Sequence, residues 1–486
     1  MLQHINSILQ LFRKCFKRNA TWKWFVVIVI GFMVKKNNRG ITSIISDMRL
    51  KPHIYHTMLH FFRSNAYEVS ALYKTWTSEV VKDPAIMRIS GRVLTNGDHS
   101  KVSKEGRKMP GMQIHHQESE NSGKGEYIVG HNYAQIGAVM FAGNTKRNIP
   151  LVTELQKSPP KIPGTKKPDG DTLVVQMANL GIKVAENIYE ATGERTIGAF
   201  DAYFSKKTLF NALKEKAALD GKQLMTAVTR AQDNYVAFFP VNPAIGEKKG
   251  RGRPRKEEAN QYGEKVVLKS LFDGMLGFTE TVMNLYGKDT KVKYLCIDLL
   301  WKPTDSIIRF VAVSSNVGQC VLMTDDLTLS AEEMITIYTL RFKIEKSFDE
   351  QKNEIGCFDY HFWTKFLERR KRKKASADPK ETTKEIEFAK KAISAFVCLG
   401  TIATGILTII AFKHDCEIWE RFPGWVRTVR SCIPSISVAK ETFSYHFHAD
   451  LRHFSHFSIA KVITPLLRDS EYLYTNSSDD FYTDVA

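Results

Sequence analysis

The spacing of apolar positions changes several times along the chain, and each change predicts a different kind of element. Thr42–Leu50 and His53–Arg63 repeat with a helical period and are separated at Lys51-Pro52, because proline disfavours helix in the residue before it. We predict that residues 1–86 are helical throughout. Two short helices across a tight turn would suit a helix-turn-helix DNA reader, and a small bundle that only packs is equally compatible with the pattern.

From Met87 onward the pattern is that of an α/β protein. Met87–Leu94 is strand-like and runs into Thr95-Asn96-Gly97-Asp98, which we predict to be a turn that ends in a carboxylate. Residues 87–221 are predicted to form the first part of an α/β core. Its later elements are a strand-like Tyr127–Phe141, a helix over Thr172–Thr192, a strand over Thr196–Phe200 that ends at Asp201, and a helix over Lys206–Ala218 with Ser205 as its N-cap.

Residues 222–324 are predicted to be a β-rich insertion between the two parts of this core. The strand-like runs, with turn residues between them, are Val266–Phe272, Lys291–Asp298, Ile307–Ser314 and Gln319–Met323. We place the second part of the core at 325–430, where a strongly helical stretch runs to about Lys352, and a C-terminal region at 431–486.

Two apolar runs were weighed as membrane segments. Phe25–Val34 is ten residues long and is followed by lysines instead of a small-residue cleavage site, so it does not fit a signal peptide. Ala392–Phe412 is long enough to span a bilayer, but threonines, glycines and a serine interrupt it, and we predict a buried helix or helix pair. Seven scattered cysteines without a Cys-x-x-Cys pair fit a reducing cytoplasm, where we expect the protein to reside. We do not expect it to be anchored in a membrane.

The charge of the chain predicts a polyanionic partner. The formal net charge is +18, with 70 Lys and Arg against 52 Asp and Glu. Residues 1–90 contain 14 basic and 4 acidic residues, so 14 − 4 = +10 of this excess lies in the first fifth of the chain. Such an asymmetry is typical of a protein that binds nucleic acid, and it favours DNA contact by the N-terminal region.

The segment Ser330–Lys352 carries the most informative pattern. Tyr338, Arg341, Glu345 and Lys352 are spaced by three, four and seven residues, steps that return to one face of a 3.6-residue helix. A carboxylate flanked by cations is what a metal site facing a phosphate needs, because the carboxylate holds the metal and the cations contact phosphate oxygens. In isolation, a solvated helix face with incidental ion pairs would explain the same residues.

This Tyr-(2)-Arg-(3)-Glu-(6)-Lys spacing resembles the signature of a large group of insertion-sequence DDE transposases. Gly97-Asp98-His99-Ser100, followed by Lys104, Gly106 and Lys108-Met109-Pro110, is similar to that family's first-aspartate segment. Phe200-Asp201-Ala202-Tyr203 is similar to its second-aspartate segment, and Gly130-His131 falls where relatives carry a Gly-His pair. The resemblance covers about residues 87–430.

The resemblance implies a ribonuclease-H-like core in which Asp98, Asp201 and Glu345 hold two Mg²⁺ ions, with Mn²⁺ as a possible substitute. Two such ions activate a nucleophile and stabilise a leaving oxygen in phosphodiester transfer. It also implies double-stranded DNA as substrate, both transposon ends and target, and a homodimer that holds two ends together. Tyr338, Arg341 and Lys352 would then contact DNA.

Other residues were weighed as DNA or metal ligands. Gly250–Lys256 resembles an AT-hook whose Arg251, Arg253, Arg255 and Lys256 would enter a minor groove, or it is a basic loop that touches phosphates. Six consecutive cations at 369–374 would neutralise phosphates or simply be solvated. Asp298, Asp325 and Asp326 end strands but are more simply turn or cap residues. The histidines 446, 448, 453 and 456 could bind zinc, although packing among aromatic residues is the simpler explanation.

Three alternatives stay open at the level of the sequence. A nuclease of the same fold would cut DNA without joining it. A catalytically inactive DNA-binding protein derived from a transposase would bind without cutting. A basic protein anchored through Ala392–Phe412 would fractionate with membranes.

Overall fold

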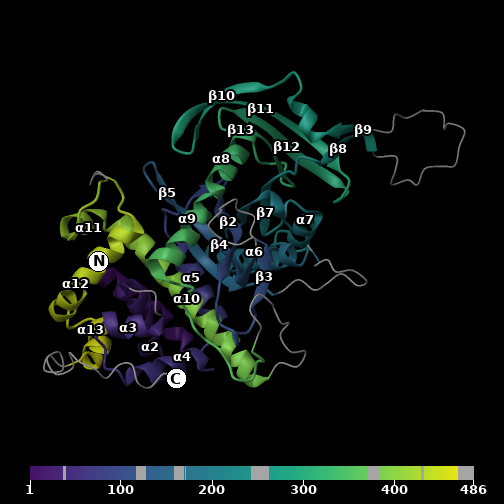
Figure 1. The fold of residues 1–486 in the computed structure, drawn as a ribbon. Coiled ribbons are helices and arrows are strands. Elements are labelled where there is room, and N and C mark those ends of the chain that lie inside the picture. The colour runs from purple at the N-terminus through teal and green to yellow at the C-terminus, as the bar shows by residue number, and fades with distance from the viewer. Residues whose placement is uncertain are drawn as a thin grey trace, which may run out of the picture.

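A computed structural model of the chain describes residues 1–36, 40–116, 127–157, 169, 171–241, 262–369, 383–427 and 432–468. The fold is mixed α/β, with 45% helix and 27% strand, as the alternation of helical and strand-like patterns predicted. Thirteen strands form one large mixed sheet, and helices cover both of its faces (Figure 1).

The elements have the following bounds. The helices are α1 Leu2–Leu11, α2 Asn19–Val34, α3 Ile41–Asp47, α4 Ile54–Arg63, α5 Val69–Val80, α6 Thr172–Thr192, α7 Lys207–Lys214, α8 Ala331–Arg341, α9 Lys343–Asp349, α10 Lys384–Lys413, α11 Asp415–Arg421, α12 Ile436–His453 and α13 Ser458–Ile463. The strands are β1 Arg88–Ile89, β2 Arg92–Ser103, β3 Gln113–His116, β4 Tyr127–Ala142, β5 Thr145–Leu155, β6 Thr196–Phe200, β7 Met225–Arg230, β8 Val236–Pro240, β9 Tyr262–Val267, β10 Thr279–Leu285, β11 Lys288–Trp301, β12 Ser306–Ser315 and β13 Gly318–Thr324.

The central part of the sheet has the order β5–β4–β2–β6–β7. The strands β2, β4 and β5 form an antiparallel meander, and β6 and β7 then add in parallel to β2. Beyond β7 the sheet continues through β13, β12 and β11 with antiparallel pairing. Strand β7 pairs in parallel with β6. The insertion predicted at residues 222–324 therefore includes a strand that belongs with β2 and β6.

Side-chain alternation along the central strands builds a separate hydrophobic core on each face of the sheet. Leu94, Ile197 and Val228 join one cluster with the apolar side of α8, while Val93 and Phe200 join the other with α6. A capping box at Ser330 and Glu333 fixes the start of α8, because each side chain bonds the other's backbone N–H. Strands β2, β6 and β7 are therefore covered by α8 on one face of the sheet and by α6 on the other.

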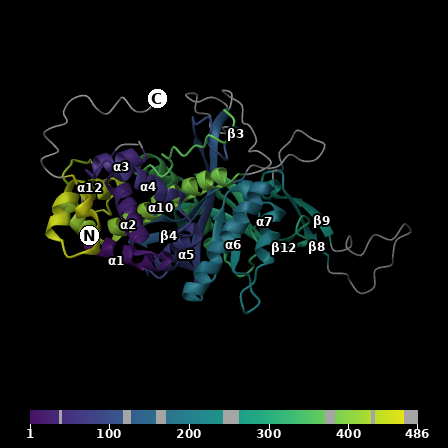
Figure 2. The same ribbon diagram turned by 90° about the horizontal axis from the view of Figure 1, so that it is seen from below.

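The N-terminal and C-terminal helices form one helical body around α10. Helix α2 packs against α10, α12 and α13, so helices from the two halves of the sequence lie side by side (Figures 1 and 2). The predicted helices Thr42–Leu50 and His53–Arg63 fall on α3 and α4. Helix α10 is long and apolar enough to cross a membrane, and its apolar stretch is fully buried within the structure. It is a single helix, where either one helix or a helix pair was expected.

Several local predictions were wrong. The segment Thr95–Asp98 is not a turn, because β2 runs through it and the chain turns earlier, at Ser90-Gly91. Ser205 does not cap α7; its hydroxyl donates to the carbonyl of Ala202, and Lys206 is the N-cap. In the predicted strand Val266–Phe272, residues 268–272 form a 3₁₀ turn.

The helix predicted up to Lys352 is divided into three parts. It breaks at Phe342, between α8 and α9, and its last turn over Glu350–Ile355 is π-helical. A π turn holds one extra residue, so the 3.6-residue spacing used in the prediction does not extend to Lys352. Gly356 ends this turn with a φ of +64°, and a Cβ there would meet the carboxylate of Asp359, so glycine is required.

Candidate active site

The strands β2 and β6 place Asp98 and Asp201 next to each other. The parallel register pairs Gly97 with Phe200, and each aspartate is the next residue on its strand path. Adjacent strands lie about 4.8 Å apart, so the two backbones meet at this point. Gly97 makes the approach possible, since a Cβ on it would come within 2.2 Å of the Phe200 ring.

Asp98 is a largely buried carboxylate. One of its oxygens accepts from the backbone N–H of His99 at 2.7 Å, and the other lies 3.4 Å from Nη1 of Arg341. The pKa of Asp98 is raised to about 7, chiefly by burial, with Asp201 and Glu345 adding to the rise and Arg341 opposing it. The fold therefore holds a desolvated acidic group whose charged form would be favoured by an added cation.

Arg341 at the end of α8 connects the predicted carboxylates. Its Nη2 donates to Oε1 of Glu345 at 2.9 Å, while Nη1 contacts Asp98. Burial opposes the charge on Arg341, but Asp201, Asp98 and Glu345 outweigh it and raise the pKa of the guanidinium. The three carboxylates, which come from three distant parts of the sequence, thus surround one cation.

Tyr338 lies one turn before Arg341 on α8. The guanidinium lies 5.9 Å from the centre of its ring. Burial raises the pKa of the Tyr338 hydroxyl to about 12, with Asp201 adding to the effect. The phenol therefore stays protonated at neutral pH and can donate a hydrogen bond to a ligand oxygen.

Lys352 reaches the same strand as Asp98 from the π turn. Its ammonium donates to Ser100 Oγ at 2.6 Å and to the carbonyl of Lys101 at 3.3 Å. Ser100 is two residues after Asp98, so both side chains leave the same face of β2. The structure therefore brings together Asp98, Asp201, Tyr338, Arg341, Glu345 and Lys352.

Asn96 is a member of this site that the sequence analysis did not identify. Its side-chain amide donates to the carbonyl of Leu340 at 3.0 Å, in the last turn of α8, and is fully buried. The bond ties β2 to the helix that carries Arg341. Alternation along β2 places Asn96, Asp98 and Ser100 on one face, whereas the Asn96-Gly97 pair by itself predicts a turn.

Three lysines from different parts of the chain converge on the backbone at the end of the π turn and just after it. Lys35 donates to the carbonyl of Gly356 at 3.3 Å and pairs with Asp359 at 3.2 Å. Lys104 donates to the carbonyl of Phe358, and Lys440 to that of Glu354. Burial lowers the pKa of both Lys104 and Lys440 to about 8. The chain that leaves the π turn is thus fixed by the helical body and by the segment after β2.

His131, from the Gly-His pair, lies on β4, the strand next to β2. Its Nδ1 lies 2.5 Å from the hydroxyl of Tyr360, and its Nε2 lies 2.8 Å from the carbonyl of Pro110. Tyr360 also bonds the hydroxyl of Tyr133 at 2.5 Å. All of these groups are buried, so His131 links the residues after β2 to the segment that follows the π turn.

Metal binding at this site depends on how the acidic side chains are arranged. Within the described part of the chain, no three His, Cys, Asp or Glu side chains form a group that could hold one. Arg341 lies between Asp98 and Glu345 and pairs with both. The donors are of the type that Mg²⁺ prefers, and the burial of Asp98 would be relieved by a cation. The carboxylate oxygens are therefore of the kind that binds a hard divalent ion. Arg341 would have to move from between Asp98 and Glu345 for both to bind the same ion.

The other aspartates that the sequence offered as alternative metal ligands bond other side chains. Asp326 pairs with Arg92, and Asp298 forms a two-pronged ion pair with Arg309. Asp325 accepts from the side-chain amide of Gln223.

The remaining candidates lie apart from this site. Histidines 446, 448 and 453 are on α12 and form no metal group within the described residues, and the ring of His446 bonds the carbonyl of Arg421. The AT-hook-like Arg251, Arg253, Arg255 and Lys256, and the basic run after Arg369, lie outside the described residues.

Comparison with known proteins does not assign the chain. No protein-family model matches it, and no curated protein matches it either.

Proposed function

We propose that the chain is a DNA transposase of the DDE type, which cleaves DNA strands at the ends of a mobile element and joins them to target DNA. The observation that carries the proposal is the gathering of Asp98, Asp201 and Glu345 around Arg341. These residues come from three segments that resemble the family's three acidic segments, and 243 residues separate Asp98 from Arg341. An incidental ion-pair cluster on a helix face would not recruit two aspartates from adjacent parallel strands.

The strand order gives independent support. A meander β2–β4–β5 followed by the parallel strands β6 and β7, with α6 between the meander and β6, is the arrangement expected of a ribonuclease-H-like core. In such a sheet, acidic residues on neighbouring strands and on a following helix share one edge. We propose this core for residues 87–221 and 325–430, with the β-rich residues 222–324 inserted.

In the proposed reaction, Asp98, Asp201 and Glu345 hold the metal ions. Bound Mg²⁺ supplies activation of the attacking oxygen and stabilisation of the leaving oxygen. Arg341 and Lys352 are placed to pair with phosphate oxygens, because both already donate to oxygens at this site. The protonated Tyr338 hydroxyl can donate to a third oxygen.

Arg341 has a further role in this proposal. Its guanidinium offsets the negative charges of Asp98, Asp201 and Glu345. A divalent ion held by these carboxylates would exchange with the guanidinium and leave it available to a DNA phosphate. The exchange predicts that metal and DNA bind cooperatively.

The proposal is tested with purified protein and the DNA that flanks its own gene, in Mg²⁺ and in EDTA. We expect Mg²⁺-dependent nicking at the element's ends and joining of the freed 3′-hydroxyl to a second duplex. The Glu345→Gln variant should lose both reactions, whereas Glu332→Gln, a matched change in the first turn of α8, should retain them. Cutting without joining would indicate a nuclease, and binding without cutting would indicate an inactive relative.

The remaining features belong to the same proposal. We expect a homodimer, because two ends must be held together, and a cytoplasmic protein without a membrane anchor. The net charge of +18 supports a DNA partner. DNA contact by the N-terminal helices and by Arg251, Arg253, Arg255 and Lys256 stays a prediction.

A further inference from the structure

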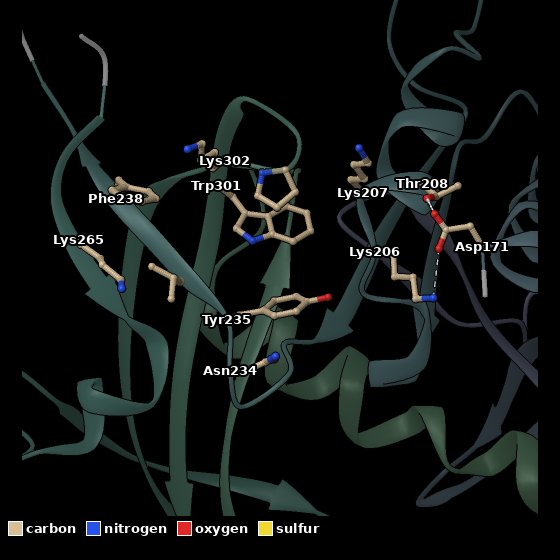
Figure 3. A pocket seen from close by; sticks show the side chains of 12 residues that line it. Asp171, Lys206, Lys207, Thr208, Asn234, Tyr235, Phe238, Lys265, Trp301 and Lys302 are labelled. Atoms are coloured by element: carbon tan, nitrogen blue, oxygen red, sulfur yellow. Dashed lines mark hydrogen bonds and ion pairs between the residues drawn. The ribbon is translucent and has the colours of Figure 1, made fainter. Parts of the chain in front are cut away.

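A cavity with a largely apolar lining and several lysines lies between α7 and the β-rich residues 222–324. It has a volume of about 570 Å³, which is within the range of ligand pockets. Figure 3 shows two walls that face each other across a floor of aromatic rings. One wall is the start of α7 and the other is formed by β8 and β9. The lining side chains that the argument uses are Lys206, Lys207, Phe238, Lys265, Trp301 and Lys302.

The charge of this cavity favours an anionic ligand. Four lysines and one carboxylate, Asp171, line it, so the lining carries 4 − 1 = +3. Asp171 is already engaged by Lys206 at 3.2 Å and by the hydroxyl of Thr208 at 2.9 Å (Figure 3). Within the described residues, Lys207 and Lys265 make no ion pair and are exposed. Their ammonium groups can therefore meet a ligand without breaking a contact.

The floor of the cavity is aromatic, which a phosphate alone does not require. Tyr235 lies over Trp301 with ring centres 5.4 Å apart, and Trp301 is buried against Phe210. Phe238 extends the apolar surface along β8. A duplex presents sugars and phosphates on its outside, whereas an unpaired base presents a flat face that stacks on such rings. Cations together with an aromatic floor thus fit a nucleotide whose base is unstacked.

The cavity is connected to the candidate active site by a short, well-fixed stretch of chain. Asp201 and Lys206 are five residues apart, which spans at most about 18 Å of extended chain. Tyr235 donates to the carbonyl of Ser205 at 2.7 Å, so the aromatic floor is bonded to that same stretch. A DNA strand that leaves the carboxylates could reach the cavity within a few nucleotides.

We propose that this cavity binds an unpaired nucleotide of a DNA strand that runs through the active site. The lysines pair with its phosphates, and its base lies against Tyr235 and Phe238. The inference rests on the proposed function for its choice of DNA as the source of the nucleotide. Free nucleotides share the same chemistry and are separated from DNA by the test.

The test measures binding of a fluorescent short oligothymidylate to the full chain in EDTA. Lys207→Gln, Lys265→Gln and Lys302→Gln, combined, should weaken binding at least tenfold and lower the salt slope by about 2, at roughly 0.7 per phosphate contact. The matched triple change Lys214→Gln, Lys269→Gln and Lys461→Gln removes three exposed lysines that do not line the cavity. The salt slope of this control variant should be closer to that of the unmodified chain than the slope of the cavity variant is.

The aromatic contribution is tested by two neighbouring phenylalanines. Phe238 lines the cavity, whereas Phe239 is exposed and leaves the opposite face of β8. Phe238→Leu should weaken binding of the oligothymidylate about tenfold and leave binding of an abasic analogue unchanged, and Phe239→Leu should change neither. Equal binding by Phe238→Leu and the unmodified chain would overturn the proposal. So would thymidine monophosphate binding as tightly as the oligomer, or a duplex binding as tightly and with the same dependence on the lysines.

Mg²⁺-dependent plasmid nicking by the unmodified chain is measured in parallel. Nicking together with lysine and Phe238 variants that bind normally would overturn this inference alone. Loss of oligomer binding in those variants, without any nicking by the unmodified chain, would overturn the proposed reaction and leave the nucleotide site in place.

Discussion

The guanidinium of Arg341 lies 3.4 Å from the carboxylate of Asp98, although 243 residues separate them in the sequence. The contact joins the middle of β2 to the end of α8 and places one cation among three acidic groups. A site of this kind is unstable without either the cation or a metal, since like charges would otherwise be held together in a largely buried place.

Replacing Arg341 should expose this dependence. Arg341→Gln removes the cation that offsets Asp98, Asp201 and Glu345, and we expect the free energy of unfolding without metal to fall by about 1–3 kcal/mol. Added Mg²⁺ should recover part of the loss. Urea unfolding at neutral pH, with and without Mg²⁺, measures both effects, and the exposed Arg107→Gln serves as control. An unchanged stability in Arg341→Gln would contradict the central role given to this residue.

The buried amide of Asn96 should matter for both stability and reaction. Asn96→Val leaves the carbonyl of Leu340 without its donor, which should cost about 1–3 kcal/mol. Asn284→Val, on the exposed strand β10, should change stability by less than about 0.5 kcal/mol. Chemical denaturation compares the two variants. If Asn96→Val proved as stable as the unmodified chain, the bond would not be what holds β2 to α8.

Glu350 in the π turn gives a prediction about pH. Burial raises its pKa from 4.5 to about 7, in spite of the nearby Arg147. Because the folded chain holds this proton more tightly than the unfolded chain, stability should fall as the pH rises from about 4.5 to 7 and then level off. Glu350→Gln removes this penalty, so it should stabilise the fold by up to about 3 kcal/mol at pH 8 and by much less at pH 5.

Unfolding midpoints measured across that pH range test the Glu350 prediction. Glu385→Gln, at the exposed start of α10, should show no such dependence. A stabilisation by Glu350→Gln that was equal at pH 5 and pH 8 would mean that the carboxyl does not titrate in this window.

The ion pair between Lys35 and Asp359 should couple the helical body to the segment that follows the π turn. Lys35 is fully buried and Asp359 is 19% exposed, so Lys35→Met should cost about 3 kcal/mol by leaving the carboxylate unpaired. The double variant with Asp359→Leu should cost less than the sum of the two single changes, with a coupling of about 0.5–3 kcal/mol. Additive costs in a double-mutant cycle would argue against a direct interaction.

Much of the core could be predicted from the sequence because its signals are local. The helix Thr172–Thr192 and the strand Thr196–Phe200 coincide with α6 and β6, since periodicity alone defined them. The turn predicted at Asn96-Gly97 failed because both residues serve distant partners. Asn96 bonds Leu340, and Gly97 admits the ring of Phe200. A pattern within one segment does not reveal such partners.

The candidate site, like the core, is predictable from the sequence only where its signals are local. Tyr338, Arg341, Glu345 and Lys352 were found by their spacing, although the break at Phe342 and the π turn alter the helix that was assumed. The shared core of the N-terminal and C-terminal helices could not be predicted, because contacts such as that of Met1 with Glu417 join residues 416 apart. Apolar helices at the two ends carry no signal that identifies them as neighbours.

The most direct test of the account is the binding of Mn²⁺, measured by electron paramagnetic resonance on the purified chain. The account predicts that Asp98→Asn, Asp201→Asn and Glu345→Gln each weaken Mn²⁺ binding at least about tenfold, while Glu332→Gln binds as the unmodified chain does. If the three variants bound Mn²⁺ as tightly as the unmodified chain, these carboxylates would not form a metal site, and the proposed reaction would lose its basis.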